Sequence, residues 1–345
     1  MLLPRTVTRG WRFTAAFYRM LWGRIWRPIG ERIGDFRKRD TFLGFFGPLS
    51  IVILLQVWAG ALIFGWGLLD WGLWLPVVSA SRHHLDFGGY LYFSGVTFFT
   101  LGYGDITPAS GIGRVCAVLE SGMGFGFLAI VIGYMPVMYG AFSRREATVS
   151  LLDARAGSPP TALEMLRRHA DAGAVDELCA ILKDIERWIS ELLESHLSYP
   201  YLALYRSQHD DQSWISALVV AMDTCALIMT GLSGVPKFQA RMTFAMGRHA
   251  VVDMCLIMNQ APAKKYLSRL SSQEMDRIVA TLAEAGIGFT DEASAEGTLA
   301  ELRRSYEPYA ITLARSFSFS LPPFVPAEGT ADDWQRSVWE RAEHF

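Results

Sequence analysis

Charged residues are scarce in this chain. Asp, Glu, Lys and Arg make up only 19% of the 345 residues, whereas 51% of the residues are hydrophobic. An ordinary soluble protein carries more charge than this, and a chain embedded wholly in a membrane carries less. The composition therefore predicts a membrane part joined to a soluble part.

Cysteine is also scarce, with four residues at positions 116, 179, 225 and 255. All four fall in segments that we expect to lie in the membrane or the cytosol, where disulfides are rare. Their spacing fits no zinc site. We therefore expect neither a disulfide nor a structural metal.

Two long stretches lack charge almost completely. Residues 41–69 contain none, and residues 112–142 contain one charge after Arg114, namely Glu120. About 20 apolar residues suffice to cross a bilayer, so we expect two membrane spans, near 41–69 and 112–142. Lys and Arg flank both spans on the same side, and the loop 70–88 is poor in them. Both termini should be cytoplasmic in the cell (inner) membrane.

The first forty residues form a basic segment, with ten Lys or Arg and three Asp or Glu. Apolar residues recur there at helical spacing, at Trp11, Ala15, Tyr18, Trp22 and Ile25. This pattern favours an interfacial helix on an anionic leaflet; the alternative is a disordered basic tail. We expect no cleaved signal peptide, because no apolar region with a small-residue cleavage site follows.

The run from Thr97 to Asp105, TFFTLGYGD, lies between the two spans. Gly102 and Gly104 lack a Cβ atom and adopt backbone angles that most residues avoid. Such glycines, alternating with ordinary residues, turn successive carbonyls to one side. Four copies around an axis would form a column of carbonyl cages, closed at the inner end by the Thr100 hydroxyls.

This run resembles the potassium-channel signature T-x-x-T-x-G-Y-G-D. The order of span, short helix 89–99, filter 100–105 and span also resembles two-transmembrane potassium channels of the prokaryotic type, over residues 41–142. The resemblance implies an all-α membrane protein with a homotetrameric pore, K⁺ as the permeant ion, no cofactor, no nucleic-acid partner and no enzymatic activity. The ion-binding residues that it implies are Thr100, Leu101, Gly102, Tyr103 and Gly104, with K⁺ at the first four.

The filter departs from the family pattern at two positions. Leu101 stands where Val is most frequent, and Val96 stands where some bacterial members have a Glu that pairs with the filter Asp. Asp105 therefore needs another partner. The candidate is Tyr92, which lies on the same short helix as Val96 and one turn closer to the outside.

Glu120 is an intramembrane carboxyl, which is costly and suggests a function. We expect it to bond to the short helix, at Thr97, and so to support the filter. The alternative is a protonated group that makes gating sensitive to pH.

The inner span contains the candidate gating residues. Gly124 lies nineteen residues after Asp105, which matches the family's hinge position; the alternative is close packing through small residues. Pro136 removes a helix hydrogen bond and should kink the span. The cavity-lining residues that we predict are Phe125, Leu128 and Ile132, with an apolar gate near Ile132 and Pro136.

The remaining chain predicts a helical cytoplasmic domain at 161–320, joined by a linker at 143–160 and followed by a loosely ordered tail at 321–345. The stretches with helical spacing are 161–172, 174–196, 212–232, 238–258, 271–286 and 296–316. No alternating strand pattern or Gly-x-Gly-x-x-Gly turn is present there, which argues against a nucleotide-binding α/β domain. The apolar run 214–233 is interrupted by Asp223 and predicts a buried core helix in preference to a third span.

Polar residues cluster twice in this domain. The candidate ligand-site or divalent-metal residues are His196, His209, Arg248, His249 and Asp253. The alternative is ordinary hydrogen bonding between helices.

The leading functional hypothesis is a K⁺-selective channel whose inner helix or filter is gated under control of the helical domain. One alternative is a ligand-sensing or enzymatic cytoplasmic protein coupled to a pore. A weakly selective cation pore is disfavoured by the intact Gly102-Tyr103-Gly104. No voltage-sensing helix with regularly spaced Arg precedes the pore.

Overall fold

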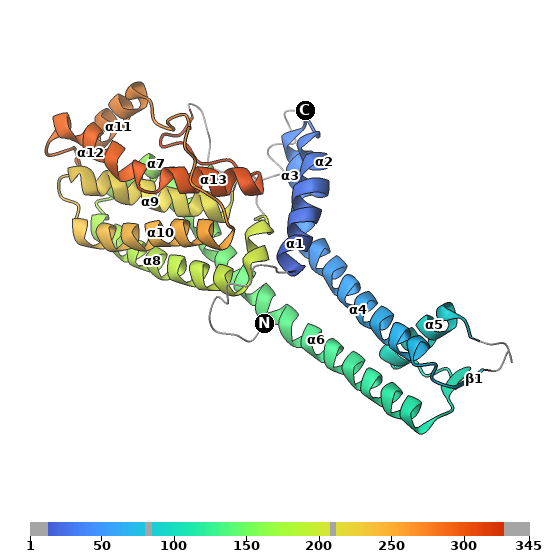
Figure 1. Ribbon diagram of the computed structural model, residues 1–345. Coiled ribbons are helices and arrows are strands. Elements are labelled where there is room, and N and C mark those ends of the chain that lie inside the picture. Colours follow the sequence, from blue (N-terminus) through green and yellow to red (C-terminus); the bar gives the residue numbers. More distant parts are fainter. Residues whose placement is uncertain (1–12, 80–84, 208–211, 328–345) are drawn as a thin grey trace, which may run out of the picture. The chain divides into compact units, whose positions relative to one another are not determined.

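A computed structural model describes residues 13–79, 85–207 and 212–327 of the chain (Figure 1). The chain is an all-α membrane protein, mostly helical, and it divides into two compact units. The pore unit comprises the chain up to Ile29 together with Phe45–Gly140. The helical unit comprises Gly30–Gly44 together with the chain from Ala141 onward.

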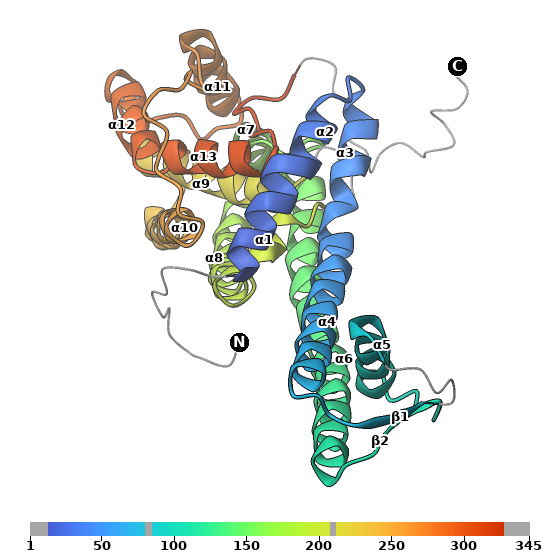
Figure 2. The ribbon, with the colours of Figure 1, turned by 45° about the vertical axis from the view of Figure 1, so that its right-hand side comes forward.

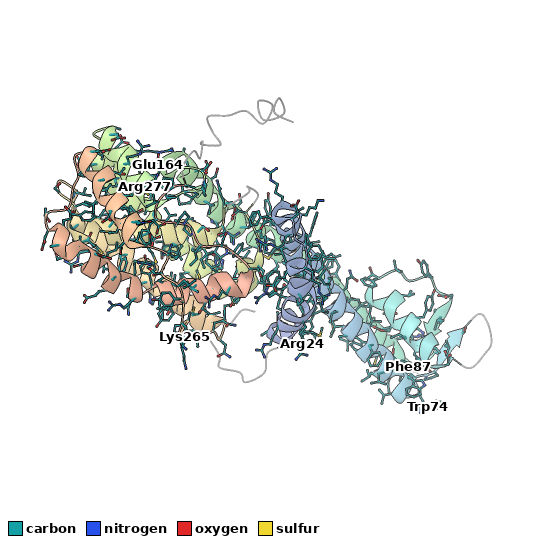
Figure 3. All side chains as sticks on the ribbon, turned by 90° about the horizontal axis from the view of Figure 1, so that it is seen from above. Arg24, Trp74, Phe87, Glu164, Lys265 and Arg277 are labelled. Carbon is teal, nitrogen blue, oxygen red and sulfur yellow. The ribbon has the colours of Figure 1, made fainter. Side chains whose placement is uncertain are left out.

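The pore unit is built on two long helices and one short helix. Its elements are α1 (Phe13–Met20), the π-helical η1 (Leu21–Trp26), the start of α2 (Arg27–Glu31), α4 (Phe46–Gly72), β1 (Val77–Ser79), α5 (Phe87–Phe98), β2 (Ile106–Pro108) and the first part of α6 (Gly111–Ala156). Figure 2 shows α5 beside α4 and α6, with the two strands near their ends. Phe87, labelled in Figure 3, packs its ring 5.5 Å from that of Trp71 and so fixes the start of α5 on α4.

The two strands were not predicted. β1 and β2 pair antiparallel, with Val78 opposite Thr107, and each is only three residues long. Strands this short give no alternating pattern in the sequence. They tie together the chain that leaves α4 and the chain that enters α6.

The helical unit contains α3 (Phe36–Gly44), the last part of α6 and a bundle of shorter helices. These are α7 (Ala162–Asp171), α8 (Val175–Ser198), the 3₁₀ helix η2 (Pro200–Leu204), α9 (Trp214–Gly231), α10 (Lys237–Ile257), α11 (Ser272–Glu284), α12 (Glu292–Arg304) and α13 (Glu307–Phe317). In Figure 1, α9 lies among α8, α10 and α13. It is the core of the bundle.

Among the described residues, three helices are long and apolar enough to cross a membrane. In the stretches Phe36–Gly72 and Gly111–Ala156, only 22% and 11% of the most apolar window is buried inside the single chain. In α9 the corresponding share is 94%. Protein covers α9 on all sides, which supports its interpretation as a core helix.

Asp223 in the middle of α9 explains how this core accepts a charge. Its carboxylate accepts two hydrogen bonds from the Arg269 guanidinium, at 2.9 and 3.0 Å, and one from the Tyr306 hydroxyl. Arg269 also donates to Glu307 at 2.8 Å. Burial raises the pKa of Asp223, and Arg269 opposes that shift. A buried charge of this kind is tolerated only when it is paired in this way.

Three sequence-based boundaries need correction. The stretch 296–316 is two helices, because Pro308 lacks an N–H and fits the first turn of a new helix, α13. The linker 143–160 is mostly helix, since α6 continues to Ala156 and the break begins at Gly157, where φ is +89°. The start of the tail is ordered, because the side chain of Phe324 is fully buried. Residues 328–345 lie outside the described residues.

Candidate functional site: the pore loop and its supports

The filter loop has an alternating backbone. Thr100, Gly102 and Gly104 have φ values of +56°, +59° and +77°, and the residues between them do not have positive φ. Residues in this left-handed region alternate with ordinary ones, which is the arrangement that turns successive carbonyls to one side. The left-handed angle at Thr100 was not predicted, since a residue with a β-branched side chain rarely adopts it.

The loop follows directly from the end of α5. The amide of Thr100 donates to the carbonyl of Thr97 at 3.0 Å, and the amide of Leu101 donates to the carbonyl of Val96 at 2.9 Å. These bonds close the last turn of α5 and set the direction in which the filter leaves it. Thr97 thus contributes its carbonyl to the base of the filter.

The side chains of the filter are exposed in the single chain. Tyr103 is 68% exposed and Leu101 is 54% exposed, whereas Phe98, immediately before the loop, is 1% exposed. One chain therefore anchors the root of the loop in its own core and leaves the loop itself uncovered.

Tyr92 lies where Asp105 needs a partner. Its hydroxyl forms a side-chain hydrogen bond with the Asp105 carboxylate. This bond connects the outer end of the filter to the helix that precedes the filter. Val96, which stands where some relatives have a Glu, is buried.

Glu120 bonds to α5, but through Ser94 and not through Thr97, so the predicted partner was wrong. The Glu120 side chain is fully buried, and one of its carboxyl oxygens bonds to the Ser94 hydroxyl. Ser94 is about one helical turn before Thr97, and residues three apart share a helix face. The sequence therefore indicated the correct face of α5, but the face alone did not decide between the hydroxyls of Ser94 and Thr97.

Gly124 packs directly against the root of the filter. A Cβ atom at this position would overlap the backbone carbonyl of Phe98, whereas the flanking Gly122 and Gly126 have no neighbour within 4 Å. The absence of a side chain at Gly124 allows this close approach of α6 to α5. Packing accounts for this glycine, and a hinge role stays a prediction.

The predicted cavity residues lie on the exposed surface of α6 in the single chain. Phe125, Leu128 and Ile132 are 69%, 54% and 64% exposed. Pro136 lies inside α6, which continues through it as one helix. The lining and gating roles of these residues stay predictions.

The N-terminal segment uses its aromatic face differently from our expectation. Trp22 is only 8% exposed, and its ring centroid lies 4.9 Å from that of Phe46. Tyr18 also packs on Phe46, so these two rings cover the start of α4. Among the described residues of the segment, the exposed large apolar side chains are those of Phe13, Met20, Ile25, Ile29 and Phe36. Trp11 lies outside the described residues.

The predicted cytoplasmic ligand site is not assembled from the described residues. His196 is buried against Trp214, with ring centroids 5.1 Å apart, whereas Arg248 and His249 are exposed on α10. His249 lies 3.5 Å from Asp253 on the same helix. His209 lies outside the described residues, and the described ones contain no group of three or more His, Cys, Asp or Glu side chains placed to hold a metal.

Arg145, near the start of the part of α6 that belongs to the helical unit, is 3% exposed. It donates to the carbonyls of Leu202 and Tyr205 at 2.9 and 2.8 Å. Its own carbonyl accepts a bond from the Trp188 indole at 3.3 Å. The inner helix is thereby attached to residues 199–206, which we call the coupling segment.

Arg206 ends the coupling segment and binds two further parts of the helical unit. One of its guanidinium nitrogens pairs with Asp40 in α3, which leads into the outer span. Another donates to the carbonyls of Phe317 and Ser318 at 3.2 and 2.8 Å. The coupling segment therefore contacts α3, the last part of α6 and the C-terminal end of α13. Sequence reasoning missed it, since these partners are 57 to 166 residues apart.

Comparison with known proteins agrees with this geometry. Residues 51–139 match the family model described as "Ion channel". The "Uncharacterized membrane protein YdjJ" of Bacillus subtilis is 23% identical over 218 residues, which cover 60% of this chain and 60% of that protein. "Protein LctB" of Geobacillus stearothermophilus is 29% identical over 97 residues, which cover 24% of this chain and 67% of that protein. No solved structure matches the chain.

The matched residues include most of α4, all of α5 with the filter loop, and α6 as far as Tyr139. The match therefore covers both spans and the loop between them, which carry the site described above. Residues 51–139 of this membrane protein are thus similar to an ion-channel domain, and they include two candidate spans.

Proposed function

We propose that this ion channel is selective for K⁺ and that its filter is Thr100–Gly104. The observation that carries the proposal is the alternating backbone at Thr100, Gly102 and Gly104 within the sequence Thr-Leu-Gly-Tyr-Gly. Rings of backbone carbonyls replace the hydration shell of K⁺ in filters of this composition. The permeant ion is the only non-protein component that we propose for the pore.

We propose that four chains assemble around the pore. One chain supplies one strand of carbonyls, which cannot surround an ion. The exposure of Leu101 and Tyr103 in the single chain is consistent with this assembly, because the neighbouring chains would cover these side chains.

We propose that the helical unit controls the gate through the coupling segment. A displacement of this segment changes the position of Arg145 on the inner helix and of Asp40 before the outer span. The bonds of Arg145 to the coupling segment and of Arg206 to Asp40 both involve a charged guanidinium, and such hydrogen bonds are stronger than neutral ones. The stimulus would act on the helical unit, and the gate would lie in α6 or the filter.

We propose that the N-terminal segment lies on the anionic inner leaflet, with both termini cytoplasmic. Arg19 and Arg24 are exposed beside the exposed apolar residues Met20 and Ile25. A basic segment with exposed apolar side chains binds anionic lipid surfaces through both charge and apolar burial.

The test of K⁺ selectivity is a planar-bilayer recording of the purified full-length protein with K⁺ on one side and Na⁺ on the other. We expect a reversal potential displaced strongly toward the K⁺ equilibrium potential. A reversal potential near zero would overturn the proposal.

Gly102→Ala should abolish the current, because a Cβ atom is strained at φ +59°. The matched control is Gly60→Ala, at a helical glycine with no neighbour within 4 Å.

A further inference from the structure

The hydroxyl of Ser94 lies between two oxygen atoms. Its Oγ is 2.9 Å from the backbone carbonyl of Ile63 on α4, and it also bonds to Oε1 of Glu120 on α6. A serine hydroxyl has one proton to donate and two lone pairs to accept with. Since the carbonyl can only accept, both bonds form together when Ser94 donates to Ile63 and Glu120 donates to Ser94.

The second oxygen of Glu120 supports this direction of donation. Oε2 is buried and has no hydrogen-bond partner among the described residues. A charged carboxylate with an unpartnered buried oxygen is far more costly than the neutral acid. The acid form needs one acceptor for its proton, and the hydroxyl oxygen of Ser94 is that acceptor.

The surroundings of Glu120 contain a second carboxyl and no described counter-charge. Asp70 on α4 is 3% exposed, has an oxygen without a partner among the described residues and interacts electrostatically with Glu120. From α5, Tyr90 interacts with Asp70, and its hydroxyl donates to the carbonyl of Leu75 at 2.8 Å. Two neighbouring carboxyls do not readily ionise together in an apolar site.

We propose that Glu120 acts in its acid form and donates its carboxyl proton to Ser94, so that Glu120, Ser94 and the Ile63 carbonyl form a tether across the pore unit. The tether holds α5 between the two spans and so positions the filter that follows α5. This inference rests on the proposed K⁺-channel function. Ser94 and Glu120 would be positioning residues, since both side chains are fully buried within the single chain.

The tether is one of three attachments that fix α5 and the filter. The others are the bond from Tyr92 to Asp105 at the outer end and the contact of Gly124 with the Phe98 carbonyl at the inner end. The tether depends on a carboxyl proton, which alkaline solution removes more readily than the phenolic proton of Tyr92. Loss of that proton would leave the single Ser94 proton for two acceptors, so one of the two bonds of the tether would be lost. It would also leave a charge in an apolar site, and the filter would lose one support.

The test is a set of bilayer recordings of the full-length protein in symmetric K⁺, with the pH of both chambers raised stepwise. We expect the wild-type current to fall at alkaline pH. Glu120→Gln should keep a K⁺-selective current and lose that fall, because the amide N–H still donates to Ser94 but does not titrate. Ser94→Ala should shorten the openings at every pH, whereas the matched control Ser121→Ala, next to Glu120 on α6, should behave as wild type.

Two outcomes would overturn the tether. One is an alkaline fall of the same size in Glu120→Gln and wild type, and the other is Ser94→Ala recordings that match those of Ser121→Ala. Size-exclusion profiles of each variant show whether it assembles, and Glu120→Gln keeps the test decisive if Ser94→Ala does not. A wild-type channel without K⁺ preference would instead refute the proposed function, while the pH comparison would still report on the tether.

Discussion

The two units surround their buried carboxyls with opposite kinds of partner. In the pore unit, Glu120 meets a serine hydroxyl and another carboxyl, with no described cation beside it. In the helical unit, Asp223 is equally buried but accepts two bonds from Arg269 and one from Tyr306. The comparison indicates that an apolar site without a counter-charge favours a neutral acid, while a protein core that supplies a guanidinium can keep a carboxylate charged.

The largest expected effect comes from replacing the two carboxyls by amides in parallel. Asp223→Asn removes the partner charge of buried Arg269 and should destabilise the helical unit by about 3–5 kcal/mol. Glu120→Gln replaces one neutral donor by another and should change stability by less than about 1 kcal/mol. Thermal unfolding of the purified full-length variants measures both. Equal losses of stability in Asp223→Asn and Glu120→Gln would contradict the contrast between a charged carboxyl in the helical unit and a neutral one in the pore unit.

A pH-dependent effect on stability is expected from His196. Burial lowers its pKa to about 3, and Arg145 acts in the same direction. Between about pH 6.5, the ordinary histidine value, and about pH 3, the unfolded chain binds a proton that the folded chain does not. The helical unit should therefore lose about 2 kcal/mol between pH 7 and pH 5.

His196→Leu should reduce that loss, as measured by unfolding of the full-length protein at a series of pH values. The control is His249→Leu, because the side chain of His249 is exposed on α10. If both variants keep the wild-type slope below pH 6.5, His196 does not cause it.

A smaller effect is expected at the attachment of the inner helix. Arg145→Gln removes charged hydrogen bonds to the coupling segment and should shift the equilibrium between open and closed states by about 1–2 kcal/mol, which is roughly tenfold. The K⁺/Na⁺ reversal potential should not change. Arg144→Gln, at the exposed neighbouring residue, is the matched control. The measurement is the single-channel open probability of each variant. Identical open probabilities for Arg145→Gln and Arg144→Gln would show that the coupling segment does not control gating.

The smallest effect is expected at the membrane surface. Arg24→Gln should weaken the attraction of the N-terminal segment to anionic lipid by about 1 kcal/mol. Open probability should then differ between wild type and the variant in anionic bilayers and converge in neutral ones. A difference that persists in neutral bilayers would argue against lipid contact.

The two long apolar helices, the short helix and the loop with alternating backbone were predictable from the sequence, because charge-free length and glycine spacing are local signals. The partner of Glu120 was assigned to the wrong hydroxyl, since Ser94 and Thr97 lie three residues apart on α5. The coupling segment was missed because its bonds join residues far apart in the chain. Spacing placed Trp22 on an apolar face of the N-terminal segment, but it could not show that Phe46 covers the Trp22 ring.

The composition of α9 has a consequence for biosynthesis. A nascent chain presents this helix to the insertion machinery after two other candidate spans, and by length and hydropathy alone it qualifies as a third. Asp223 raises the cost of inserting it by a few kcal/mol. The same side chain that later binds Arg269 would thus also keep α9 out of the bilayer during synthesis. Replacing Asp223 by an apolar residue would therefore risk an inverted topology for everything that follows it.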